Sequence, residues 1–134
     1  MIKEITKYIE NNITEFTIDT NLFAGFRPSD APELCSVVQE TGAGKPEFDI
    51  PDAVEKTIQI ITRGNSYFTA RVQAMKIYAF LHGKSGITLP VVDTGVIYLA
   101  NTIQAIQIPQ YIGQDEKGLF EFSANYIFMI QDGS

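Results

Sequence analysis

The clearest hydrophobic pattern in the chain is a strand that runs directly into a helix. Between residues 54 and 63, apolar and polar residues alternate, so that side chains such as Ile58 and Ile60 share one face. A period of two is typical of a half-buried β-strand. Ser66 follows the end of this run and is a suitable N-cap for the helix that we predict over residues 66–83.

The helix predicted over residues 66–83 carries two apolar stripes on opposite sides. A surface helix of a globular protein needs only one such stripe, so the second must meet another partner. The N-terminal helix of the same chain is the favoured partner, and a neighbouring subunit is the alternative. The first stripe consists of Tyr67, Ala70, Ala74, Ile77, Tyr78 and Leu81, and the second of Phe68, Val72, Met75 and Ala79.

A second helix and four further strands are predicted from the rest of the chain. Ile2, Ile5 and Ile9 recur at helical spacing between charged residues, which predicts an amphipathic helix over residues 2–12. The runs that have the alternation or the short apolar content of strands cover residues 15–22, 34–39, 102–107 and 120–131, and the third run could extend back to residue 96.

These elements predict a single α+β domain over residues 1–134, in the order α-β-β-β-α-β-β. Helices and strands do not alternate strictly, so we expect a mainly antiparallel sheet of four to five strands flanked by the two helices. The predicted core consists of Phe16, Ile18, Val54, Ile58, Ile60, Ala70, Ala74, Ile77, Leu81, Phe122, Tyr126 and Phe128.

The strand-and-helix stretch also resembles a known family. The run Ile58–Gly64 and the helix positions that end in Leu81-His82-Gly83 look like the core of the tail terminator and minor capsid proteins of tailed bacteriophages, of the lambda type. The run Pro109–Gly118, followed by Asn125-Tyr126, is similar to the last hairpin of those proteins. The resemblance spans residues 54–131 and is looser before residue 54.

The resemblance implies a structural virion protein of a phage or prophage, and not an enzyme. Such a protein forms a homo-oligomeric ring, a hexamer in the virion built from subunits that are monomeric when free. The ring caps the tail tube protein at the head-proximal end of the tail, stops tail polymerisation and contacts the head-completion protein. Assembly takes place in the host cytoplasm, and DNA is only a passing cargo. The alternative within this class is a head-completion minor capsid protein on the portal side.

Two polar segments without a hydrophobic period, residues 41–51 and 84–93, are predicted to be mobile in the free subunit and to become ordered in the ring. Charged residues near them are expected to pair across the subunit interface and to set its register. The alternative is that they are ordinary solvated charges. The candidate interface residues are Lys45, Asp49, Asp52, Arg63, Phe68, Arg71, Val72, Met75, Lys84 and Asp93, with Glu55 as a further acidic partner.

Composition narrows the possible partners. The chain has 134 residues, 45% of them hydrophobic, and a formal net charge of −6. It therefore lacks the broad basic face of a dedicated nucleic-acid binder, although DNA could slide past it because carboxylates and phosphates repel each other. The apolar runs are too short to span a membrane, and the first residues lack the apolar core of a signal peptide.

No catalytic, cofactor or metal site is predicted. Cys35 and His82 are the only cysteine and histidine, so neither an internal disulfide nor a usual cluster of metal ligands can form. Cys35 is expected to be inert packing, and His82 to cap the C-terminus of a helix, where a cation can favour the helix dipole. A small α+β ligand-binding domain is the alternative from another class, because the Phe and Tyr residues would suit a pocket between helix and sheet, as they would a plain core.

Overall fold

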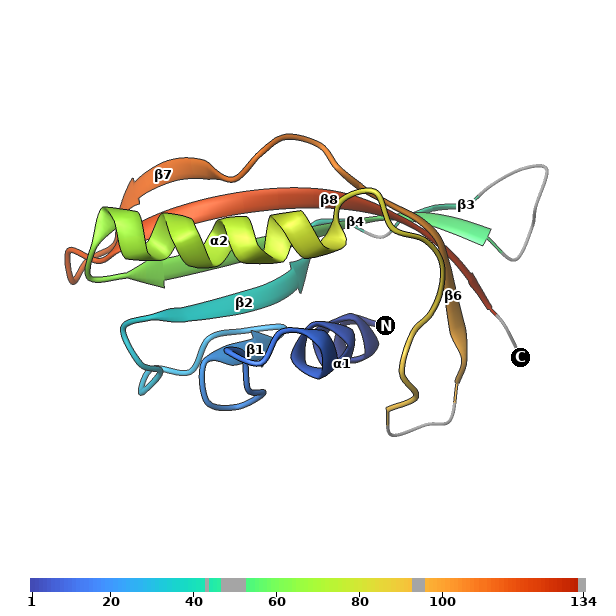
Figure 1. The fold of residues 1–134 in the computed structure, drawn as a ribbon, viewed down its shortest axis with the longest axis horizontal. Coiled ribbons are helices and arrows are strands. Elements are labelled where there is room, and N and C mark those ends of the chain that lie inside the picture. The colour runs from blue at the N-terminus through green and yellow to red at the C-terminus, as the bar shows by residue number, and fades with distance from the viewer. Residues whose placement is uncertain (43, 47–52, 93–95, 133–134) are drawn as a thin grey trace.

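The computed structural model describes residues 1–42, 44–46, 53–92 and 96–132, which form two helices and eight strands (Figure 1). In chain order they are α1 (Ile2–Asn12), β1 (Leu22–Ala24), β2 (Cys35–Glu40), β3 (Lys45–Pro46), β4 (Ala53–Gly64), α2 (Tyr67–Leu81), β5 (Ser85–Thr88), β6 (Tyr98–Ala105), β7 (Gln110–Gln114) and β8 (Phe120–Asp132).

The strands form one sheet in the order β1-β2-β4-β8-β6-β5, in which β3 adds to β4 and β7 adds to β8. Every pair is antiparallel except β1 with β2. The long pair of β4 and β8 forms the centre, from Ala53 opposite Gln131 to Gly64 opposite Phe120. The α+β class with a mainly antiparallel sheet is therefore confirmed. The sheet has more strands than predicted, because β1, β3, β5 and β7 are too short to show a period in the sequence.

Both helices pack on the same face of the sheet. The main core cluster joins Ile5 of α1 and Ile77 of α2 to Ile60 of β4 and Tyr126 of β8. Even-numbered positions of β4 and β8 point towards the helices, as the period of two requires. The opposite face carries a polar ladder in which Gln59 bonds to side chains on both neighbouring strands. Because both helices lie on one face, the opposite face of the sheet and the outer sides of the helices are not covered by a helix among the described residues.

Ten of the twelve predicted core residues are buried. The two exceptions, Ile18 and Val54, are only half-buried. Val54 lies in the end of β4 that pairs with β3, two strand positions before the buried Lys56. Ile18 packs on the edge of the core cluster from a turn.

The strand predicted over residues 15–22 is wrong, because this segment forms turns. Asp19 has a φ of 66°, and the backbone N–H of Leu22 donates to the carbonyl of Thr17. The side chain of Asn21 closes the turn at both ends, since it accepts from the N–H of Thr17 and donates to the carbonyl of Glu15. Asn and Asp stabilise turns through such local bonds, and here they override the alternation of apolar residues.

The two segments predicted to be irregular also contain strands. Residues 85–88 form β5, which pairs with β6, and residues 45–46 form β3. Gly86 has a φ of 63°, a left-handed conformation that glycine adopts without strain. Residues 43, 47–52 and 93 lie outside the described part of the chain, so the predicted mobility of these segments stays a prediction.

A substitution on α2 tests this packing. Leu81 is fully buried in the core cluster, so Leu81→Ala should lower the free energy of unfolding by about 2–5 kcal/mol through the cavity that it leaves. Urea unfolding followed by circular dichroism measures the change, with the exposed Phe68→Ala as the matched control. A loss for Leu81→Ala as small as that of the control would contradict the assigned core face of α2.

Candidate functional site

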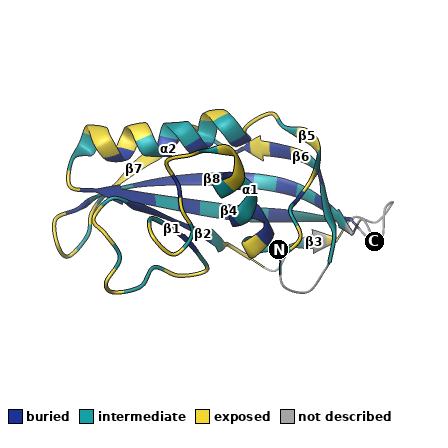
Figure 2. Ribbon diagram, turned by 60° about the horizontal axis from the view of Figure 1, so that its bottom comes forward, coloured by how far each residue is buried: buried dark blue, intermediate teal, exposed yellow. Residues whose placement is uncertain are grey.

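The second apolar stripe of α2 is open to solvent. Phe68 is 74% exposed and Val72 is 50% exposed, while Met75 is half-buried. The prediction that the N-terminal helix covers this stripe is wrong. α1 meets a different flank of α2, where the ring of Tyr8 packs against Phe80 with 5.0 Å between the centroids. The exposed positions of α2 are visible in Figure 2.

β7 continues this apolar surface from α2 to the edge of the sheet. Tyr67 contacts both Phe68 and Tyr111, with 5.2 Å between ring centroids in each case. Tyr111 and Ile112 are exposed, and β7 pairs with β8 alone, so its outer edge has no strand partner among the described residues. We call Phe68, Val72, Tyr111 and Ile112 the α2–β7 patch.

The α2–β7 patch is the main concentration of exposed apolar side chains. Eight large hydrophobic residues in the described part of the chain are exposed, and six of them belong to α2 or to residues 106–112. Scattered exposed apolar residues are normal, whereas a group of them beside an open strand edge marks an interaction site. The sequence pointed to the α2 half of this patch through the second stripe, whereas for β7 it offered only the resemblance of residues 109–118 to a hairpin and no apolar pattern.

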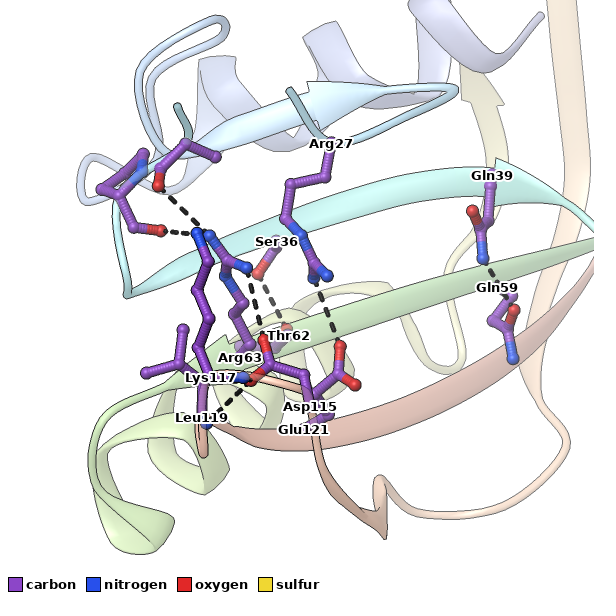
Figure 3. Close-up of polar contacts among 12 residues, drawn as sticks. Arg27, Ser36, Gln39, Gln59, Thr62, Arg63, Asp115, Lys117, Leu119 and Glu121 are labelled. Atoms are coloured by element: carbon purple, nitrogen blue, oxygen red, sulfur yellow. Dashed lines mark hydrogen bonds and ion pairs between the residues drawn. The ribbon is translucent and has the colours of Figure 1, made fainter. Parts of the chain in front are cut away.

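Arg63 was expected at the surface, but the structure buries it. It is 5% exposed, and both of its Nη groups have partners within the chain, whereas its buried Nε has none among the described residues (Figure 3). Nη1 lies 3.4 Å from a carboxylate oxygen of Asp115, and Nη2 donates to the carbonyls of Ala31 and Pro32 at 3.1 and 3.2 Å. A buried charge that already has its partners contributes no rim pair to an interface, so the expected pairing of Arg63 with Asp49, Asp52, Glu55 or Asp93 is not supported.

The surroundings of Arg63 join three distant parts of the chain. Arg27 forms an ion pair with Glu121 of β8 at 3.3 Å, next to the pair of Arg63 with Asp115. One oxygen of Asp115 also accepts from the N–H groups of Lys117 and Leu119, both at 2.9 Å, which closes the turn between β7 and β8. Sequence analysis placed Asp115 in a turn but missed its partner, because residues 52 positions apart give no signal of contact.

The other predicted interface residues are dispersed. Arg71 is exposed and forms no hydrogen bond or ion pair with another described residue. The ammonium of Lys84 lies 5.3 Å from the ring centroid of Phe80, so it is engaged within the chain. The backbone of Lys45 pairs with Glu55. Asp49, Asp52 and Asp93 lie outside the described residues.

His82 is the C-cap residue of α2, at the helix end where it was expected. Its Nδ1 accepts a hydrogen bond from the backbone N–H of Ala105 at 3.0 Å, and its ring stacks on Tyr78. This hydrogen bond ties the end of α2 to β6. Cys35 is buried, and this burial raises the pKa of its thiol.

The hollow beside α2 offers little to a small ligand. The hollow beside α2, which Phe16 and Cys35 help to line, measures about 130 Å³, below the roughly 300–1,000 Å³ that is usual for ligand pockets. Within residues 1–42, 44–46, 53–92 and 96–132, no group of three or more His, Cys, Asp or Glu side chains is placed to hold a metal ion. No helix in that same part is long and apolar enough to cross a membrane.

The fold and the open surface thus define a small α+β protein with an exposed apolar edge suited to assembly. A model of the bacteriophage tail terminator protein family matches residues 9–132, so the chain belongs to that family. It is a structural protein of a phage tail and hence a virion component. No curated protein matches the chain at a significant level.

The environment of Asp115 predicts a pH dependence of stability. The hydrogen bonds from the backbone N–H groups of Leu119 and Lys117, together with the positive charge of Arg63, lower the pKa of Asp115 below its ordinary value. A carboxyl group whose pKa is lower in the folded state stabilises the fold above its unfolded pKa, near 3.9, and loses this contribution as the pH falls. Asp115→Asn should therefore be less stable than the wild type at pH 7, and the gap should close towards pH 3. Urea unfolding at both pH values measures it, and a gap that stays constant would contradict the charge effect.

Proposed function

We propose that the protein assembles head to tail into a closed ring, a hexamer in the virion, that caps the head-proximal end of the tail tube. The ring stops tail polymerisation and offers a docking face to the head-completion protein. Subunits are monomeric when free and assemble in the host cytoplasm. The mechanism is geometric, because a rotation between subunits that closes yields a ring and not a filament.

The observation that carries this proposal is the α2–β7 patch. The family match supports a role in the tail, and the patch supplies an apolar surface that the described part of the chain leaves uncovered. An open strand edge next to an apolar helix stripe can add both backbone hydrogen bonds and buried apolar area to an interface. Neither chemistry nor a cofactor is needed for this task.

The acidic charge of the subunit suits a ring through which DNA passes. With a net charge of −6 per subunit, a hexamer carries a large negative charge that disfavours binding to phosphates. DNA is then a cargo that moves through the ring and not a ligand. A head-completion role on the portal side is the second candidate, since its subunits also form small rings.

Co-purification separates these two candidates. The protein, bearing an affinity tag, is incubated with purified tail tubes or with portal complexes from the same phage. We expect the tagged protein to be retained with the tubes and to reduce their further growth when tube protein is added. Retention with the portal complex alone would contradict the terminator role.

Variants of the stripe test the role of the α2–β7 patch. The double variant Phe68→Ser, Val72→Ser should fold with an unchanged thermal midpoint, because both side chains are exposed. Tails assembled with it should grow beyond their normal length, as measured by electron microscopy. Thr69→Ser, at an exposed position of the same helix but outside both stripes, is the matched control and should give tails of normal length. Normal tails from the double variant would exclude the stripe from assembly.

A further inference from the structure

The edge of the sheet opposite β7 carries an open hollow. β1 and the loop between β1 and β2 surround it, and β1 and β7 lie at opposite sides of the sheet (Figure 1). The hollow measures about 400 Å³, which is large enough for an aromatic side chain. Its lining combines the apolar residues Phe23, Pro28, Ala31 and Pro32 with three exposed polar residues, which we call the rim: Asp19, Thr20 and Asp30.

The two carboxylates at this rim are available for a partner. Asp19 and Asp30 are both exposed, and neither side chain forms a hydrogen bond or an ion pair with another described residue. Two carboxylates beside an apolar hollow are suited to bind a partner that carries an apolar group next to a cation.

α2 carries an apolar side chain next to a cation, on a part of the subunit away from the β1 edge. Phe68 is the most exposed large hydrophobic side chain of the described residues. Arg71 lies three residues further along α2, so both side chains project from the same side of the helix, and its guanidinium has no partner in the described chain. An aromatic side chain with a cation one turn away matches an apolar hollow with an acidic rim.

We propose that the occupant of the hollow is α2 of a second copy of this chain, with Phe68 inserted between Phe23, Pro28 and Ala31 and with Arg71 paired to Asp30 and Asp19. The charge complementarity selects this occupant. A contact between different surfaces on opposite sides of the subunit is heterologous and can repeat around a ring. The inference rests on the proposed function only for its biological setting, because it concerns how two copies meet.

Arg63 acquires a role in this arrangement without touching the neighbour. Its Nη2 donates to the carbonyls of Ala31 and Pro32, two residues of the hollow, and Asp115 holds the guanidinium from the turn after β7. Arg63 is thus a positioning residue that keeps the lining of the hollow in shape. The ion pair of Arg27 with Glu121 fixes the start of the same loop to β8.

A photo-crosslinker tests the contact directly. The variant Phe68→p-benzoylphenylalanine is prepared in isotopically labelled and in unlabelled form. Equal amounts of the two forms are mixed and irradiated in two samples, one at high protein concentration and one in the presence of tail tubes. We expect mass spectrometry to find crosslinks between labelled and unlabelled copies, within a peptide that contains residues 19–32. Crosslinks to another segment of the second copy, such as residues 110–114, would overturn the proposed contact. So would crosslinks to the tube protein alone, or no crosslink between copies.

A charge exchange provides the second, independent test. Arg71→Glu and Asp30→Lys should each raise the concentration needed for half-maximal ring formation on tail tubes by about tenfold or more, because like charges then face each other. The combined variant should return to within about threefold of the wild type. Glu116→Lys, at an exposed position that is not part of the lining of the hollow, is the control and should not compensate for Arg71→Glu.

These outcomes separate the inference from the proposed function. If wild-type protein does not cap tubes, the proposed function fails, and the crosslinks between concentrated copies still decide the contact. If wild-type rings form but the combined variant assembles no better than the single ones, the terminator role stands and this contact is wrong.

Discussion

The long pairing of β4 with β8 is the constraint on which the rest of the structure depends. It places the even-numbered side chains of both strands on one face, and α2 must cover that face with Ala70, Ala74 and Ile77. Small side chains at two of these positions allow the helix to lie close to the sheet. Because α1 takes the neighbouring area over β1 and β2, none of the described elements covers the other side of α2. The exposed stripe is thus a direct consequence of how the core is filled.

A buried charge network links the two sides of the sheet. Arg63 projects to the face away from the helices and connects the loop after β1 with the turn between β7 and β8. Breaking such a buried pair is costly, because one partner would be left charged without compensation. The network therefore holds the hollow at one edge and the end of β7 at the other in a fixed relation. Subunits that meet through both edges need that rigidity, since small errors in angle accumulate around a ring.

The sequence predicted the parts of the fold that have a period, and missed those that depend on distant contacts. Strand β4, helix α2 and its core face followed from spacing alone, as did the second stripe. The segment around Asp19 was misread, since its apolar alternation coexists with turn-forming residues whose side chains bond locally. Arg63 was taken for a surface charge, because nothing local reveals Asp115 or the carbonyls of Ala31 and Pro32 as its partners. β7 is short, bulged and exposed, so it shows no hydrophobic period, and only the resemblance of residues 109–118 to a hairpin pointed to it.

Amide hydrogen exchange of the free subunit and of the tube-bound ring tests most directly whether the edges left open by this packing are the assembly surfaces. The account predicts that residues 110–114 of β7, the first turns of α2 and the loop of residues 25–34 exchange more slowly in the ring. The centre of β4 should be unchanged, because it is already paired on both sides. Unchanged exchange in β7 and α2, with protection confined to other segments, would contradict the account.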